Sequence, residues 1–269
     1  MSKLIVPSQQ PNQEKSVVKV TPESANWGYV GFEVYTLAKG DKISMDTGEQ
    51  EVCIVLLSGY ANARTKQQKW NNIGQRMHIF EEIPPYAVYV PSGDQYEVEA
   101  LTDAEIAVCT APGKGTYEAR LIAPKDVRVD MRGSGKTLRR IHNILPEDQP
   151  ADSLLIVEVY TPNGNWSSYP PHKHDQENLP NEAYLEETYY HRIKQANGFA
   201  LQRVYTDDRS LNETMVVKDG DVVLVPKGYH PVSAPPGYDL YYLNTMAGPV
   251  RTWKFTNDAD HEWMMTQTV

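Results

Sequence analysis

The chain has 269 residues, a formal net charge of −9 and 40% hydrophobic residues, a composition that is ordinary for a globular protein. This length is enough for one large domain or two small ones. No apolar run approaches the roughly 18 residues that a membrane span needs, and an acidic chain without a basic cluster argues against nucleic acid as its main partner.

The N-terminal residues show no sign of export. They lack the apolar core of a signal peptide, and the Pro, Gln and Asn residues from Pro7 onward are typical of a solvated arm. Cys53 and Cys109 have no ligand-like spacing, so we expect buried, reduced thiols. These features predict a cytoplasmic protein.

Short apolar or alternating runs, bounded by Gly, Pro, Asn and Asp, recur along the whole chain. Those of the first half lie at residues 29–38, 51–57, 86–90 and 105–110. Those of the second half lie at residues 154–160, 187–193, 199–205, 222–225 and 240–244. Such runs with turn residues between them predict an all-β chain of the sandwich or barrel type.

A weak internal repeat relates the two halves. The strand in residues 219–230 ends in a Pro-x-Gly turn before His230, and residues 84–96 repeat this arrangement before Tyr96. The first half has no His-x-His pair, so we expect it to lack metal ligands. Arginines and glycines form a polar stretch between the halves. We therefore expect domains at residues 1–125 and 151–269, joined by a connection at residues 126–150.

The chemistry-bearing residues gather in the second half. His172 and His174 follow two prolines on an expected extended segment, so both imidazoles should lie on one face while Lys173 points away. Glu187 opens an apolar strand, where an unpaired charge would be costly. His230 follows the turn after a later strand. Three imidazoles and one carboxylate form a ligand set suited to Zn, Mn, Fe or Ni.

Glu186 competes with Glu187 for the role of the carboxylate ligand. Strand alternation puts Glu187, Tyr189 and His191 on one face, or Glu186, Thr188 and Tyr190 on the other. We favour Glu187, because its face carries more polar chemistry suited to the surroundings of a metal.

Three motifs carry a resemblance to a known family. They are Asn165-Trp166-Ser167-Ser168-Tyr169-Pro170-Pro171-His172-Lys173-His174-Asp175, Leu185-Glu186-Glu187-Thr188-Tyr189-Tyr190 and Pro226-Lys227-Gly228-Tyr229-His230-Pro231. The histidine pair, glutamate and later histidine resemble the cupin arrangement, and the duplicated halves resemble a bicupin. In detail the motifs look like those of the 5-deoxy-glucuronate isomerases of inositol catabolism, a resemblance that covers nearly the whole chain. Two tandem cupin barrels are therefore expected.

The spacing departs from the usual cupin pattern at two places, one of them the single residue, instead of two, between Gly228 and His230. Twelve residues separate His174 from Glu187, where ordinary cupins have three or four, so residues 175–186 must loop out. We interpret this loop as a candidate lid over the substrate.

The resemblance implies an aldose–ketose isomerisation of 5-deoxy-D-glucuronate to 2-deoxy-5-keto-D-gluconate through an enediolate. A divalent metal, with zinc favoured over Mn, Fe or Ni, would polarise the carbonyl. Tyr189 and His191 are candidates for the proton transfer, and Tyr229 is a candidate for orienting His230 or the sugar. Lys227 and Arg251 are candidates for binding the substrate carboxylate.

Two alternatives have the same ligand set. A cupin dioxygenase would hold Fe(II) with it, and a sugar-binding bicupin would have no catalytic activity. Under each hypothesis the partner is a small molecule, without nucleic acid or membrane. Exposed β edges and a ligand-free half also predict a homodimer.

Overall fold

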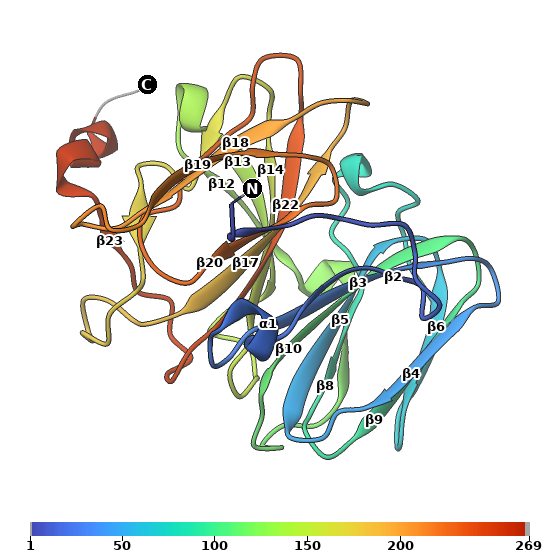
Figure 1. Ribbon diagram of the computed structural model, residues 1–269. Coiled ribbons are helices and arrows are strands. Elements are labelled where there is room, and N and C mark those ends of the chain that lie inside the picture. Colours follow the sequence, from blue (N-terminus) through green and yellow to red (C-terminus); the bar gives the residue numbers. More distant parts are fainter. Residues whose placement is uncertain (1, 267–269) are drawn as a thin grey trace. The chain divides into compact units, whose positions relative to one another are not determined.

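The computed structural model describes residues 2–266, and the chain divides into two compact units. One unit contains residues 9–128 and 143–156. The other contains the N-terminal residues up to Ser8, residues 129–142 and the residues from Val157 onward. Each unit is built from strands (Figure 1), so the prediction of an all-β chain is confirmed.

The first unit contains two sheets. The six-stranded sheet has the order β11-β8-β5-β10-β3-β2 and the four-stranded sheet has the order β4-β9-β6-β7. Their bounds are β2 Ser16–Val20, β3 Gly31–Leu37, β4 Lys42–Asp46, β5 Gln50–Ser58, β6 Ala61–Thr65, β7 Lys69–Ile73, β8 Ala87–Val90, β9 Gln95–Ala100, β10 Ala104–Pro112 and β11 Arg120–Ile122.

Aliphatic and tyrosine side chains from both sheets fill the interior of this unit. β5 contributes Val52, Ile54 and Leu56, which alternate along the strand and therefore share one face. The facing sheet contributes Val98 and, at the position of the expected repeat, Tyr96. The interior is thus a packed apolar core, which explains why the strand pattern of the first half is so strongly hydrophobic.

Most residues of a seven-stranded sheet of order β1-β20-β17-β22-β14-β13-β12 belong to the second unit, which also contains a four-stranded sheet of order β15-β21-β18-β19 and the pair β16-β23. The bounds are β1 Ile5–Val6, β12 Arg128–Arg132, β13 Arg139–Leu145, β14 Leu155–Thr161, β15 Trp166–Ser167, β16 His172–Lys173, β17 Glu186–Ile193, β18 Ala200–Tyr205, β19 Asn212–Val217, β20 Val222–Val225, β21 Val232–Ser233, β22 Leu240–Ala247 and β23 Thr256–Asn257.

The bounds of the units differ from the expected domains in two places. β1 forms an antiparallel pair with β20 in the second unit, Ile5 opposite Val223. Residues 126–150, expected as a connection, contain β12 and β13, which are neighbours in the seven-stranded sheet. The Gly and Arg residues of this segment belong to a hairpin, because its tip needs Gly133 at a φ of 81°.

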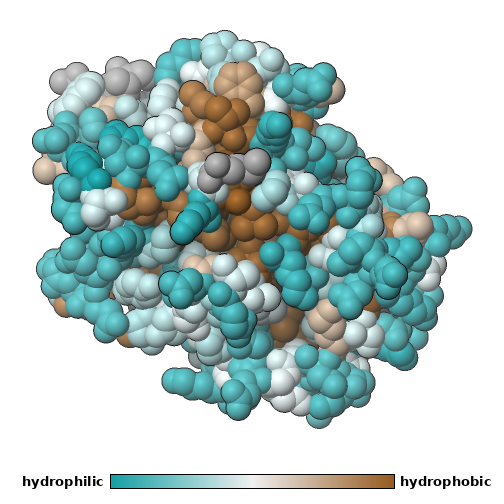
Figure 2. All heavy atoms as spheres, viewed as in Figure 1, coloured by the Kyte–Doolittle hydropathy of each residue, from teal (hydrophilic) through white to brown (hydrophobic). Residues whose placement is uncertain are grey.

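The helical elements are short and connect strands. They are α1 Pro22–Ala25 and the 3-10 helices η1 Ile79–Glu81, η2 Pro124–Asp126, η3 Gly135–Thr137 and η4 Ala259–Met265. None of the helices within residues 2–266 is both long and apolar enough to cross a membrane. One face of the molecule carries mainly hydrophilic side chains, with hydrophobic atoms visible in patches between them (Figure 2).

Candidate metal centre

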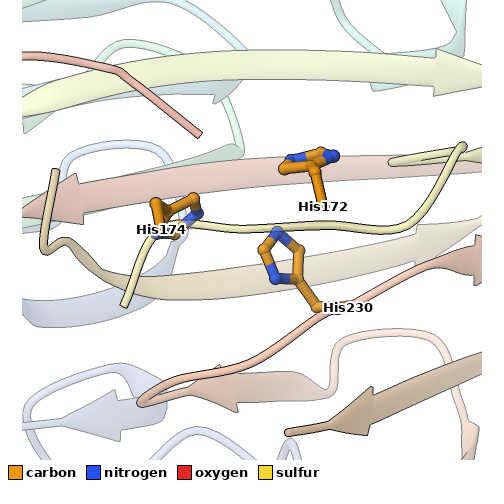
Figure 3. Close-up of side chains that lie close together, drawn as sticks. All are labelled: His172, His174 and His230. Atoms are coloured by element: carbon orange, nitrogen blue, oxygen red, sulfur yellow. The ribbon is translucent and has the colours of Figure 1, made fainter. Parts of the chain in front are cut away.

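Two segments of the second unit bring three histidines together. β16 pairs with β23 so that His172 lies opposite Asn257, and His174 follows on the same extended segment (Figure 3). Strand alternation turns Lys173 the other way, where its Nζ lies 3.0 Å from Asp175 Oδ1. His230 approaches from the turn after β20. The ligand atoms of the three histidines all lie within 4.8 Å of one another.

The turn before His230 depends on Gly228. Its φ is 90°, a conformation that L side chains rarely adopt, and an added Cβ would lie 2.5 Å from the backbone oxygen of Tyr205. The amide of Gly228 donates to Asp175 Oδ2 at 2.9 Å, while its carbonyl oxygen lies 2.8 Å from His230 Nδ1. Gly228 therefore links the two segments that carry the histidines.

Backbone carbonyls fix the tautomers of two histidines. Nδ1 of His174 lies 2.9 Å from the carbonyl oxygen of Leu185, and Nδ1 of His230 lies 2.8 Å from that of Gly228. Because each Nδ1 donates to an oxygen, each neutral ring leaves Nε2 without a proton and available as a ligand.

Glu187 completes the cluster. Its Oε2 lies 3.1 Å from His174 Nε2 and 3.3 Å from His230 Nε2. The buried His230 Nε2 makes no hydrogen bond within the described chain. A bare nitrogen lone pair facing a carboxylate oxygen repels it unless a cation lies between them. Ligands of one metal, each about 2.0–2.2 Å from the ion, are themselves about 3 Å apart.

The charge states of the histidines favour metal binding. Burial lowers the pKa values of His172 and His230 to about 3, so both rings are neutral near pH 7. Burial also opposes the charging of His174, yet its hydrogen bond to Glu187 and the charge of that carboxylate raise its pKa above the ordinary value. A metal would replace this proton on His174. The donor set thus fits a divalent metal ion.

A cavity of about 390 Å³ opens beside His172, a size common for small-molecule sites. Its walls come from the β12–β13 hairpin, the segment before β16 and the C-terminal residues. It is lined by Arg132, Gly133, Ser134, Thr137, Arg139, Tyr169, Pro170, His172, Trp253, Phe255, Asn257, Met264 and Met265.

Tyrosines and hydroxyls line the interior next to the cluster. Tyr189 packs against His230 with ring centroids 5.7 Å apart, and its hydroxyl lies 2.8 Å from Ser168 Oγ. Tyr242 is hydrogen-bonded to Ser167. Burial raises the pKa of Tyr189 well above its ordinary value, and the charge of Glu187 adds to this shift. Tyr189 is therefore a neutral hydrogen-bond donor at physiological pH.

His191 lies one step further along the same face. It stacks on Tyr189, and its Nε2 lies 2.8 Å from Gln202 Oε1. Because that amide oxygen accepts, Nε2 carries the proton and the buried Nδ1 is bare, without a hydrogen bond inside residues 2–266. Burial lowers the pKa of His191 to about 4.

The structure brings together the four expected metal ligands, with Glu187 facing the histidines. Glu186 lies on the opposite face, where its Oε1 is 3.4 Å from the hydroxyl of Tyr184. Tyr189 and His191 share the face of Glu187, as strand alternation predicts.

Three other candidates lie elsewhere. The hydroxyl of Tyr229 donates to Asp207 Oδ1 at 2.8 Å. Lys227 is exposed, and neither it nor Arg251 is among the residues that line the cavity. Sequence reasoning missed Arg139 because it lies in a segment expected to be a connection. The apolar alternation in residues 141–145 could have predicted that Arg139 begins a strand.

Backbone contacts hold the loop at residues 175–186 in place. Buried Glu182 accepts from the amides of Asp175 and Gln176 at 2.8 and 3.0 Å, and the amide of Ala183 donates to the carbonyl of Lys254 at 3.0 Å. This loop contributes no lining residue to the cavity beside His172. The described structure therefore gives the lid interpretation no support.

Comparisons with known proteins agree with the sequence motifs. A model described as the KduI/IolB family matches residues 4–264. A 5-deoxy-glucuronate isomerase from Geobacillus kaustophilus (strain HTA426) is 70% identical over 265 residues, 98% of this chain and 96% of that protein. The isomerase of the same name from Bacillus subtilis (strain 168) is 48% identical over 255 residues, 94% of each chain.

Solved structures show the same fold. An IolB-like protein from Salmonella typhimurium LT2 has a TM-score of 0.95 and 50% identity, covering 97% of this chain and 99% of that one. Lactobacillus farciminis oxalate decarboxylase has a TM-score of 0.67 at 13% identity, covering 99% of this chain and 91% of its own. The second likeness concerns the fold alone, which is the expected bicupin. The family model and the two isomerase relatives show that the chain belongs to the KduI/IolB family.

Proposed function

We propose that this chain is a metal-dependent isomerase that converts 5-deoxy-D-glucuronate to 2-deoxy-5-keto-D-gluconate. The observation that carries the proposal is the cluster of three histidines and Glu187 at a cavity, in a chain 70% identical to a 5-deoxy-glucuronate isomerase. This near full-length identity favours an isomerase over an Fe(II) dioxygenase or a non-catalytic sugar-binding bicupin.

We propose zinc as the metal held by His172, His174, Glu187 and His230. Three imidazoles and one carboxylate suit zinc, although Mn, Fe and Ni accept the same donors. When bound, a divalent ion supplies a Lewis acid that polarises a carbonyl oxygen and stabilises the charge of an enediolate.

The proton transfer is assigned to residues on the same face of β17 as Glu187. His191 has a bare Nδ1 and a fixed Nε2 proton, so it is the candidate acceptor for the hydrogen on the carbon beside the aldehyde. Tyr189 is neutral and donates, so it is the candidate to hydrogen-bond a substrate oxygen. Tyr229 acts as a positioning residue, because its backbone pairs with Tyr205 directly before His230.

We also propose that the protein is a cytoplasmic homodimer. Edge strand β12 exposes Val129 and Met131, at 43% and 56% of their surface, and exposed apolar edge strands are liable to pair with another chain. Light scattering of the wild-type protein and of Met131→Lys tests this. A wild-type monomer would overturn the dimer.

The test of function is a metal analysis combined with an isomerase assay by NMR. We expect one metal per chain and turnover of 5-deoxy-glucuronate. Glu187→Gln should keep the shape of the side chain while weakening metal binding, and turnover should recover at high metal concentration. Full turnover by metal-free His172→Ala, or turnover that consumes oxygen, would contradict the proposal.

A further inference from the structure

Arg139 carries a charge that no acidic residue of the described chain balances. It begins β13, and its half-buried guanidinium lines the cavity beside His172. Its Nη1 donates to two backbone oxygens, those of Thr137 at 3.0 Å and Tyr169 at 3.4 Å. Across residues 2–266 it forms no ion pair. Guanidinium stays charged at any physiological pH and presents five N–H donors. Its Nε and Nη2 donors therefore remain available to a ligand in the cavity that Arg139 lines.

Arg132 adds a second cation to the same cavity. It comes from β12, and its guanidinium lies over the Trp253 ring at 5.5 Å from the centroid. Arg132 is likewise in no ion pair within the described residues. Two arginines that line one cavity repel each other, an effect that contributes to the lowered pKa of Arg139 after the larger effect of burial. An anion between them would remove this repulsion.

Apolar side chains form another part of the cavity wall. Trp253, Phe255 and Met264 line the cavity together with the arginines, and Phe255 packs on His172 with ring centroids 4.7 Å apart. In 5-deoxy-glucuronate the carbon next to the carboxylate is a methylene. A subsite with cationic and apolar walls matches a carboxylate attached to a CH₂ group better than one attached to a hydroxylated carbon.

We propose that Arg139, assisted by Arg132, binds the substrate carboxylate, so that the aldehyde end of the open-chain sugar acid extends toward His172. This inference rests on the proposed function and assigns the binding of its substrate to two residues of the β12–β13 hairpin. It replaces Lys227 and Arg251 as candidates. Planar guanidinium can bind a carboxylate through two parallel hydrogen bonds, which fixes orientation as well as charge.

The test compares two substrates in the metal-loaded protein. They are 5-deoxy-D-glucuronate and 5-deoxy-D-glucose, in which CH₂OH replaces the carboxylate. We expect Arg139→Met to lower kcat/KM for the acid about 100-fold, and Arg139→Lys about tenfold. Neither should lower kcat/KM for the neutral sugar. Arg128→Met removes an exposed charge from the neighbouring strand β12, outside the residues that line the cavity, and is the matched control.

Metal content distinguishes a binding role from a structural one, because each variant should keep one metal per chain. Equal losses on the acid and the neutral sugar would overturn the proposal while leaving the isomerase function intact. If Arg139→Met does not fold, Arg139→Lys and Arg132→Met decide in the same way.

A binding measurement remains decisive if the wild-type protein does not isomerise the acid. The probes are the products of reducing the aldehyde of each sugar, an aldonic acid from the acid and an alditol from the neutral sugar, neither of which can isomerise. Calorimetry should show tighter binding of the aldonic acid to the wild type, and Arg139→Met should abolish this preference. No preference in the wild type would overturn the carboxylate subsite, whereas absence of turnover alone would overturn the proposed function.

Discussion

Replacement of Gly228 by alanine should damage both stability and the metal centre. A non-glycine residue at a φ of 90° costs about 1–3 kcal/mol. The new Cβ would also lie 2.5 Å from the oxygen of Tyr205, which would have to move to the 3.4 Å of ordinary contact. That backbone cannot yield easily, because the amides of Tyr205 and Tyr229 each donate to the other residue's oxygen. The turn that carries His230 must therefore shift.

Gly237→Ala is the matched control. Gly237 has a φ of 95°, but an added Cβ would meet nothing within 4 Å. This variant should lose only the conformational cost, about 1 kcal/mol, or roughly 2–4 °C in apparent melting temperature. Gly228→Ala should lose about 2–3 kcal/mol in addition. Its metal affinity should fall about 10–100-fold, because Gly228 orients His230 through its carbonyl oxygen.

Thermal unfolding and metal titration of the two variants test this reasoning. If Gly228→Ala matched Gly237→Ala in both melting temperature and metal affinity, the close approach to Tyr205 would have no energetic consequence, and the assigned role of the turn would be wrong.

Three further predictions concern pH, isotope exchange and the first unit. Burial lowers the pKa of His191 to about 4, against an unfolded value near 6.5, so the free energy of unfolding should fall by about 2 kcal/mol as the pH drops to 5. Urea unfolding of His191→Gln should lack this loss. An unchanged pH dependence in the variant would contradict the prediction. In D₂O the aldehyde carbon, which becomes the CH₂OH carbon of the product, should gain deuterium detectable by NMR, whereas full transfer of the original hydrogen would indicate a hydride shift. Glu51→Ala should lower the free energy of unfolding in urea by about 3–5 kcal/mol without changing metal affinity. The reason is that the buried carboxylate accepts from Tyr89 and from the amides of Ser153 and Leu154, each at 2.6 Å. A loss below about 1 kcal/mol would refute this reasoning.

The parts of the histidine–glutamate cluster that depend on local geometry could be predicted from the sequence. Alternation along an extended segment puts His172 and His174 on one face, and alternation along β17 groups Glu187 with Tyr189. The choice between Glu187 and Glu186 needed the structure, because alternation defines two faces and leaves open which one is internal.

The cavity could not be predicted in the same way. Its walls bring together the β12–β13 hairpin, the segment before β16 and the C-terminal residues, whose proximity depends on long-range sheet pairing. Arg139 stands in no motif, and its role is inferred from its place in the cavity wall and from the lack of an acidic partner within residues 2–266. Lys227 is the opposite case. Its place in the motif suggested that it binds the substrate carboxylate, but its side chain is exposed to solvent in the turn.

The pairing of β1 with β20 has a consequence for biosynthesis. Ile5 and Val6 leave the ribosome more than 200 residues before their partners Val223 and Val222. Domains generally fold while synthesis continues, but β1 must wait unpaired until β20 has been made. β20 leads directly into the turn that carries His230. A strand made early therefore completes the sheet beside the turn that carries His230, so a truncation that removes β1 should disturb this turn.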